Sequence, residues 1–215
     1  MAFAYPVLLE LAGRRCVVVG ERAVREGKAQ ALLEAGAGEV TVVAEGPRAQ
    51  LDRLSACGAH VERRAWRPAD LDGAFLVVGW GASERERDRL AAEARRRGAL
   101  VNVIDDARWC DFAAPAVVRR GPLVVAIGTG GTSPALARKL REDLEGRFGP
   151  HWTELVRVLG EVRHRTASTL PDLRERSRRW AEALDLEEAD RLTSEGRSAE
   201  LRERLLRRLA SGGAA

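Results

Sequence analysis

The sequence of 215 residues has no uninterrupted apolar run approaching the roughly 18 residues that a membrane-spanning helix needs. Its N-terminal stretch, MAFAYPVLLELAGRR, places the short apolar segment before the basic pair, which is the reverse of the order in a secretory signal. These absences exclude an integral membrane protein and predict a cytoplasmic protein without a membrane partner.

Cysteine and histidine, which build many metal sites, are scarce and scattered. The sequence contains three of each: Cys16, Cys57, Cys110, His60, His151 and His164. They do not have the close spacing of a zinc motif, and Cys16 begins a predicted core strand. The sequence therefore predicts reduced, structural thiols and no resident metal site.

Lysine and aromatic residues are also rare. Only Lys28 and Lys139 are lysines among 36 basic residues, and aromatic residues make up 5% of the chain. The 36 basic and 32 acidic residues are interleaved along predicted helices, as on solvated helix faces, so the net charge of +4 is small. Because aromatic platforms for base stacking are few, the sequence predicts no nucleic-acid partner.

The first half of the chain does contain a regular alternation of apolar strands and amphipathic helices. Predicted strands cover residues 16–19, 40–44, 60–64, 74–78 and 100–104, and predicted helices cover 26–35, 47–57 and 84–97. Continuous apolar strands between amphipathic helices are typical of a parallel sheet covered on both faces. We therefore predict an α/β, Rossmann-like parallel-sheet domain over residues 1–112.

The pattern changes after this domain. Residues 113–147 are predicted to form two strands, a glycine-rich turn and a helix that starts at Pro134 with Ser133 as its cap. We predict this small α+β unit to be a dimerisation segment, because two strands are too few to bury their own apolar faces. Residues 148–215 are predicted to form a C-terminal helical domain.

The turn after the first strand has the outline of a dinucleotide site without its usual glycines. It reads GERAVR over residues 20–25, where the G-x-G-x-x-G/A fingerprint has glycine at position 22 and a small residue at 25. Glu21 adds negative charge near the expected pyrophosphate, whereas the Arg22 guanidinium could contact it. Glu45 follows the second strand, 25 positions after Gly20, where an acid can bind ribose hydroxyls.

Two longer motifs carry a resemblance to a known family. The segments VNVIDD…CDF…PA (residues 101–116) and GTGGTSPALAR (residues 128–138) resemble the siroheme-synthase dehydrogenase family of precorrin-2 dehydrogenase and sirohydrochlorin ferrochelatase. The resemblance covers about residues 5–150. It implies a first domain that binds NAD, a middle segment that forms a homodimer, and C-terminal helices that help cover a tetrapyrrole substrate.

The resemblance also implies functional residues in the first domain. The predicted cofactor-binding residues are Gly20, Arg22, Ala23, Val24, Glu45 and Gly46. Asp105 matches the family's catalytic aspartate and follows the strand 100–104 at the sheet edge where α/β proteins bind ligands, so it is predicted to act as the base. The alternative is that Asp105 and Asp106 are ordinary turn residues.

The glycine-rich turn of the middle segment is the predicted substrate site. Its residues are Thr129, Gly130, Gly131, Thr132 and Ser133, which can direct backbone N–H groups at an anion where a helix starts. Arg119 and Arg138 are predicted to bind carboxylate arms of the tetrapyrrole, and Arg120 and Arg141 lie nearby in sequence. The alternative for the turn is an ordinary helix cap.

The predicted function is NAD-dependent oxidation of precorrin-2 to sirohydrochlorin in siroheme biosynthesis, with iron insertion as a further activity of the family. Three alternatives stay open. They are a chelatase or tetrapyrrole carrier that has lost NAD, a Rossmann-type nucleotide-sensing regulator, and a basic scaffold that binds nucleic acid. Stabilisation by NAD, sirohydrochlorin or DNA in a thermal-shift assay distinguishes them.

Overall fold

The computed structural model describes residues 5–169 and 172–211. Contacts within the chain divide it into two compact units, Met1–Ala114 and Pro115–Ala215. The division into three domains at residues 112 and 147 stays a prediction, and residues 1–4, 170–171 and 212–215 of those domains lie outside the described residues.

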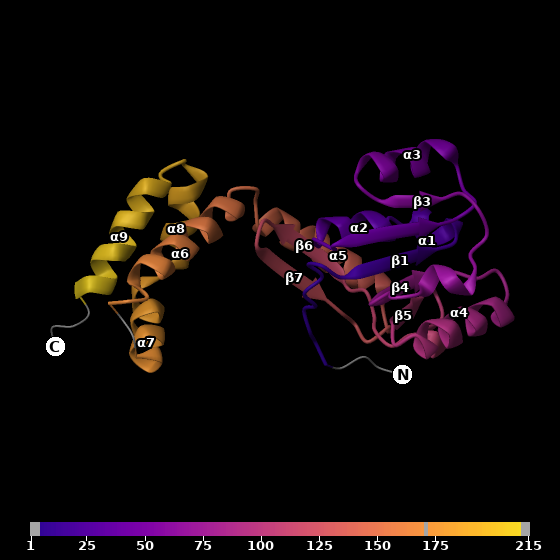
Figure 1. Cartoon of the computed structure of the whole chain (residues 1–215). Helices are drawn as coiled ribbons and strands as arrows, with labels where there is room; N and C mark the ends of the chain where they lie inside the picture. The colour runs from indigo at the N-terminus through magenta and orange to yellow at the C-terminus, as the bar shows by residue number, and fades with distance from the viewer. Residues whose placement is uncertain (1–4, 170–171, 212–215) are drawn as a thin grey trace. The chain divides into compact units, whose positions relative to one another are not determined.

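The first unit is built on a five-stranded parallel sheet. Its strands are β1 (Arg15–Val19), β2 (Glu39–Val43), β3 (His60–Glu62), β4 (Leu76–Gly79) and β5 (Leu100–Val103). They lie in the order β3-β2-β1-β4-β5, and each neighbouring pair is parallel (Figure 1). The predicted Rossmann-like sheet is confirmed, and its strand order reverses between β1 and β4, where such folds bind ligands.

Helices cover both faces of this sheet. They are α1 (Glu21–Arg25), α2 (Lys28–Glu34), α3 (Arg48–Ala56) and α4 (Glu84–Arg96), with the short 3-10 helices η1 (Pro68–Leu71) and η2 (Ala107–Trp109). Local sequence fixes the start of α4, because the Glu86 N–H donates to the Ser83 hydroxyl and the Ser83 N–H donates to the Glu86 carboxylate.

Alternating strand residues enter two separate cores. Val18 of β1 packs with Leu51 of α3 on one face of the sheet, whereas Val17 and Val19 pack with Leu90 of α4 on the other. Each of these five side chains is at most 1% exposed. Burial on both faces explains why the strands read as continuous apolar runs.

The helix predicted over residues 26–35 is confirmed as α2, which covers Lys28–Glu34, but the sequence did not predict α1 before it. Gly27 has a left-handed conformation with φ 71° and separates α1 from α2. Glycine adopts this conformation without steric cost. Val24 before the break and Ala29 after it face the same core, so both short helices pack on one face of the sheet.

The second unit begins with the antiparallel pair β6 (Ala116–Arg120) and β7 (Leu123–Ile127), followed by α5 (Pro134–Arg147). The Ser133 hydroxyl accepts a hydrogen bond from the Leu136 N–H at 3.2 Å and Pro134 opens the helix, so the predicted cap is confirmed. Within α5, all of which the structure describes, no residue is buried. Leu136 is 51% exposed and Leu140 is 39% exposed, which leaves an apolar face uncovered.

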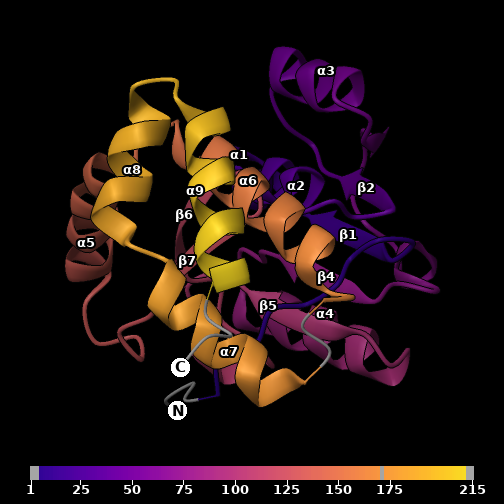
Figure 2. The same cartoon turned by 90° about the vertical axis from the view of Figure 1, so that its left-hand side faces the viewer.

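The remaining helices form a bundle within the second unit (Figure 2). They are α6 (Trp152–Thr166), α7 (Leu173–Ala183), α8 (Leu186–Ser194) and α9 (Ser198–Ser211). Leu155 and Val158 of α6 pack with Leu192 of α8 and Leu205 of α9 in a shared core, so the predicted C-terminal helices are confirmed. Across the described part of the chain, no helix is both long and apolar enough to cross a membrane.

Candidate cofactor and substrate sites

The turn after β1 depends on glycine at its first position. Gly20 has φ 89° and ψ 150°, a region that side chains rarely enter. Its N–H donates to the Val43 carbonyl at 3.0 Å, and a Cβ at this position would lie 2.8 Å from the Trp80 carbonyl oxygen. Gly20 therefore lets the chain turn tightly between β2 and β4 at the carboxyl end of β1.

A cavity of about 220 Å³ opens beside this turn, at the carboxyl ends of β1, β2 and β4. Its lining includes Gly20, Glu21, Val43, Ala44, Glu45, Arg64, Ala65, Trp66, Trp80, Gly81, Ala82 and Glu86. The volume is below the roughly 300–1,000 Å³ typical of small-molecule pockets, so the cavity suits one end of a dinucleotide. Its position at the reversal of strand order matches the ligand site of open α/β sheets.

The lining of the cavity includes an acidic side chain without a partner in the described chain, Glu45, and a basic side chain that is already paired, Arg64. Glu45, two residues after the end of β2, is exposed, and its carboxylate makes no ion pair or hydrogen bond within residues 5–169 and 172–211. The Arg64 guanidinium instead binds both carboxylate oxygens of Asp70 at 2.8 Å. These two hydrogen bonds lower the pKa of Asp70. They also keep the Arg64 guanidinium paired within the protein, so it is not free to bind a ligand.

The charged residues of the turn are paired with one another and with the end of β5. The Glu21 carboxylate binds the Arg25 guanidinium at 2.6 Å. The Arg22 guanidinium binds Glu26 at 2.9 Å and also forms an ion pair with Asp105, which is 83 positions further along the chain. The Arg22–Asp105 ion pair joins the predicted cofactor turn directly to the predicted catalytic base.

Asp105 has a backbone conformation that sets it apart from Asp106. It has φ 62°, the one positive value at a non-glycine residue among those described. Aspartate tolerates this left-handed conformation better than most residues. Its side chain is 61% exposed, whereas Asp106 is 13% exposed and binds Arg108 through both carboxylate oxygens.

Asp106 therefore has a structural role in holding this loop. Its hydrogen bonds from Arg108, with the nearby Arg87 guanidinium at 3.3 Å, lower its pKa to about 2. A carboxylate with so low a pKa stays ionised and paired at neutral pH. Of the two adjacent aspartates, Asp105 is the one that remains accessible.

The motif residues after Asp105 fasten the loop back onto the edge strand β5. The Cys110 thiol lies 3.2 Å from both the N–H and the carbonyl of Val103, and the Asp111 carboxylate accepts from the Val101 N–H at 3.0 Å. The Asn102 amide donates to the Phe112 carbonyl at 2.8 Å. These bonds cover an otherwise unpaired strand edge and fix the position from which Asp105 projects.

The second predicted site, the turn at residues 129–133, has no charged residue. The Thr129 hydroxyl accepts from the Ser133 N–H and donates to the Ser133 carbonyl, each at 3.2 Å. Gly130 and Gly131 have φ 61° and 81°, and in the described chain no hydrogen bond uses their N–H groups. Both glycines are exposed, so these donors are available to an anion at the start of α5.

The four arginines near this turn fall into two pairs. Arg120 donates to the carbonyls of Phe148 and Glu145, and Arg141 binds the Glu145 carboxylate at 2.5 Å. The guanidinium groups of Arg119 and Arg138 are exposed and have no partner within the described residues. Only the second pair is available to a ligand without giving up a contact.

Comparison with known proteins identifies the family. Residues 7–116 match the family model described as "Putative NAD(P)-binding", and residues 120–147 match the one described as "Sirohaem biosynthesis protein central". The chain belongs to the siroheme synthase N-terminal family. The predicted resemblance is thereby confirmed.

Known siroheme synthases align with nearly the whole of this chain. The siroheme synthase of Chromobacterium violaceum is 36% identical over 212 residues, which cover 98% of this chain and 44% of the relative. The siroheme synthase of Methylococcus capsulatus is 34% identical over 210 residues, which cover 97% of this chain and 44% of the relative. The chain thus spans less than half the length of these relatives.

A solved structure matches over the full chain. The structure titled "SirC, precorrin-2 dehydrogenase" has a TM-score of 0.64 and 25% sequence identity, and the match covers 96% of this chain and 99% of that one. The predicted combination of a Rossmann-like sheet, a small α+β segment and C-terminal helices is therefore confirmed as the fold of this family member.

The structure places some of the residues predicted for the cofactor at the cavity, but Arg22 is not among its lining residues. Gly20 and Glu45 line the cavity, and a Cβ on Gly46 would lie 3.3 Å from the Glu21 side chain, at the same place. Ala23 and Val24 are instead buried in the core, at 0% and 1% exposed, and do not line the cavity. Among described residues, no cluster of three or more His, Cys, Asp or Glu side chains could hold a metal ion.

Sequence reasoning missed the aromatic walls of the cavity. Trp80 directly follows β4, and Trp66 lies on the loop after β3, with the Arg89 guanidinium 4.7 Å from the centre of its ring. The rule that placed Glu45 at the carboxyl end of β2 applies equally to Trp80 after β4, and would have found it. The sequence around Trp66 carries no comparable signal.

Proposed function

We propose that this chain is an NAD-dependent dehydrogenase that oxidises precorrin-2 to sirohydrochlorin. The observation that carries the proposal is the Arg22–Asp105 ion pair, which joins a glycine-dependent turn beside a cavity to an accessible aspartate. The solved structure titled precorrin-2 dehydrogenase, which matches 96% of this chain, supports the choice of substrate. The siroheme synthases support the pathway, although the chain spans only 44% of their length.

The residues around the cavity fit NAD. Gly20 allows the backbone to approach a pyrophosphate, and Glu45 is placed to accept hydrogen bonds from ribose hydroxyls. Arg64 is committed to Asp70, so the cavity has an unpaired acid and no unpaired base to receive an additional phosphate. We therefore favour NAD over NADP. When bound, the nicotinamide accepts hydride.

Asp105 is the proposed base. The oxidation removes two hydrogens from the substrate, one as hydride and one as a proton, and the exposed Asp105 carboxylate would accept the proton. Asp106 cannot take this role while both of its oxygens bind Arg108. The bonds from Asp111 and Cys110 to β5 hold the loop in position during the transfer.

We propose that the turn at residues 129–133 binds carboxylate arms of the tetrapyrrole. The unused N–H groups of Gly130 and Gly131 and the unpaired cations Arg119 and Arg138 are suited to carboxylates. Thr129, Thr132 and Ser133 complete this proposed site. Iron insertion into sirohydrochlorin stays part of the proposal as a second activity of the family.

We further propose a cytoplasmic homodimer formed through residues 113–147. The exposed Leu136 and Leu140 leave an apolar face on α5 that a second copy would cover. Three free cysteines, of which Cys16 has a pKa raised to about 11 by burial, are consistent with a reducing compartment. Replacing both leucines with arginine should convert a dimer to a monomer in light scattering; a monomeric wild type at micromolar concentration contradicts this part of the proposal.

The direct test is an assay of the whole chain with precorrin-2 and NAD. The expected result is NAD-dependent appearance of the sirohydrochlorin absorbance, with NAD binding detected independently by calorimetry. The alternative of a chelatase or carrier is correct instead if calorimetry detects no NAD binding at millimolar cofactor while sirohydrochlorin still binds. Stabilisation by a nucleotide or by DNA, without any effect of the tetrapyrrole, would favour the regulatory or scaffold alternatives.

A further inference from the structure

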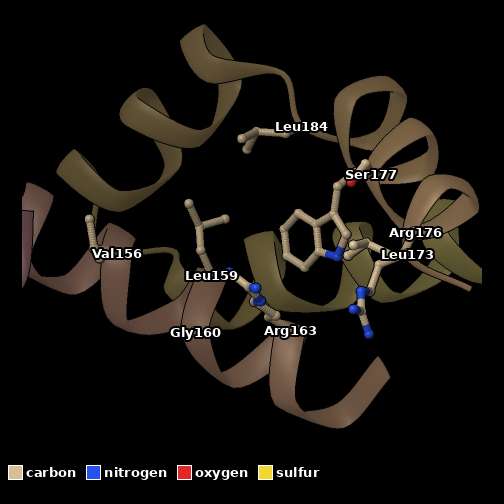
Figure 3. Close-up of a pocket in the computed structure, with 9 residues that line it drawn as sticks. Val156, Leu159, Gly160, Arg163, Leu173, Arg176, Ser177 and Leu184 are labelled. Carbon is tan, nitrogen blue, oxygen red and sulfur yellow. The ribbon is translucent and has the colours of Figure 1, made fainter. Parts of the chain in front are cut away.

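The helical bundle contains a second cavity, of about 460 Å³, that the proposed dehydrogenase reaction does not use. Its lining comes from α6, α7 and the residue after α7, and consists of Val156, Leu159, Gly160, Arg163, Leu173, Arg176, Ser177, Trp180 and Leu184 (Figure 3). The volume falls within the roughly 300–1,000 Å³ typical of small-molecule sites. Five of these residues are large and apolar or aromatic, so the cavity favours an apolar body.

One charged group at the cavity has no partner among the described residues. The Arg163 guanidinium is exposed and makes no ion pair or hydrogen bond in the described chain, whereas the Trp180 indole nitrogen is covered by protein and only its ring is open to a ligand. An unpaired cation beside an apolar cavity indicates an apolar ligand that carries a carboxylate.

Gly160 supplies an independent argument. It lies in the interior of α6, where glycine destabilises a helix relative to alanine. A Cβ at this position would meet no atom within 4 Å, so neither packing nor a special backbone conformation requires glycine. The missing side chain leaves the wall of the cavity open at the level of Leu159 and Arg163, where a larger residue would occupy the space.

We propose that this cavity binds a small amphipathic monocarboxylate. The apolar chain of the ligand lies against Leu159, Leu184 and the Trp180 ring, and its carboxylate binds Arg163. In Figure 3 the Arg163 and Arg176 side chains lie on the side of the cavity away from Leu184, which gives the site a charged and an apolar end. The site is independent of the cofactor turn, so it stands whether or not the dehydrogenase proposal is correct.

The proposal is tested by measuring, with calorimetry on the whole chain, the affinities for octanoate and for octanol, which has the same chain length without the charge. Wild type should bind octanoate more tightly than octanol. Gly160→Leu should fill the cavity and weaken octanoate binding at least about tenfold, the size expected when buried apolar contacts are excluded. Its melting temperature should not fall, because leucine is the better helix former, and this shows that the loss is not unfolding.

Arg163→Gln tests the charged end. It should weaken octanoate binding about two- to fivefold, the range of an exposed ion pair, and leave octanol binding unchanged. The matched control is Arg165→Gln, which removes an exposed arginine from the same helix outside the cavity and should change neither. The proposal is overturned if wild type does not bind octanoate at millimolar concentration, if Gly160→Leu binds as wild type does, or if Arg163→Gln weakens both ligands equally.

Discussion

Two turns of this chain have glycines at positive φ, and the turns differ in the space around the glycine and in the charge of the neighbouring residues. At the first, Gly20 is enclosed by backbone, and the neighbouring charges Glu21 and Arg22 are already paired within the protein. At the second, a Cβ on Gly131 would meet no atom within 4 Å, and the turn itself carries no charge. One turn is closed and charged, and the other is open and neutral.

The difference shows how each turn can receive an anion. The second turn offers N–H groups that no hydrogen bond among the described residues uses, so a carboxylate can bind there without displacing a described contact. At the first turn, a pyrophosphate that binds Arg22 must compete with Asp105 for the same guanidinium. The departure from the usual fingerprint at position 22 therefore does more than add bulk, because it couples the cofactor turn to the proposed base.

The largest effect is expected at the charged turn, from Asp105→Asn. The amide cannot accept the proton, so turnover of precorrin-2 should fall by roughly a hundred- to ten-thousand-fold. The fold should persist, because the Asp105 side chain is exposed and asparagine tolerates a positive φ as well as aspartate. Sirohydrochlorin absorbance measures the loss and circular dichroism checks the fold; turnover at the wild-type rate would remove Asp105 from its role.

The different space around the two glycines predicts different losses of stability when each is replaced by alanine. Gly20→Ala combines a glycine-only conformation with a contact of 2.8 Å to the Trp80 carbonyl, so it should cost at least the upper end of roughly 1–3 kcal/mol. Gly131→Ala meets only the conformational cost of φ 81°, roughly 1–2 kcal/mol. Urea unfolding measures both, and equal losses would show that the enclosure of Gly20 is unimportant.

The sequence predicted the sheet and the second turn because their causes are local. Period and composition identify the five strands of the sheet, and Ser133 followed by Pro134 is a helix start that needs no tertiary contact. The helix α1 was missed because its five residues are too few to show the apolar period of a helix.

The candidate site was less predictable because its decisive contacts join distant residues. Asp105 was chosen from its motif, and Arg22 was considered only as a phosphate ligand. Their ion pair spans 83 positions, and no local pattern encodes it. The same holds for Trp66, whose place in the wall of the cavity depends on how the loop after β3 folds over the sheet.

The ion pair itself predicts a coupling between the two residues in NAD binding. If Asp105 competes with the pyrophosphate for Arg22, Asp105→Asn should tighten NAD binding about two- to fivefold, the range of an exposed ion pair. In an Arg22→Gly background, the same substitution should have no effect on NAD affinity. Arg22→Gly alone should loosen NAD, because the guanidinium is expected to contribute more as a phosphate ligand than its bulk obstructs. Calorimetry at low salt measures the wild type, the two single variants and the double variant.

The control for this cycle is Asp52→Asn. It removes an exposed carboxylate of the same unit that is paired with Arg63, and so changes the net charge identically without touching Arg22. Asp52→Asn should leave NAD affinity unchanged. Equal tightening by Asp105→Asn in both backgrounds would mean that general charge, and not competition for Arg22, sets the affinity; absence of NAD binding in every variant would instead contradict the dehydrogenase proposal.

The smallest effect is expected at Glu21, although its charge lies closest to the expected pyrophosphate. Its carboxylate binds Arg25 at 2.6 Å, so much of the repulsion toward an anion is already compensated. Helix α1 has only five residues, and its dipole adds little at this end. Glu21→Gln removes the charge but also releases Arg25, so NAD should bind only about twofold more tightly, and the gain should vanish at high salt. Calorimetry at two salt concentrations checks this. Tightening of tenfold or more would mean that Arg25 does not screen Glu21, and that the irregular turn weakens NAD chiefly by charge.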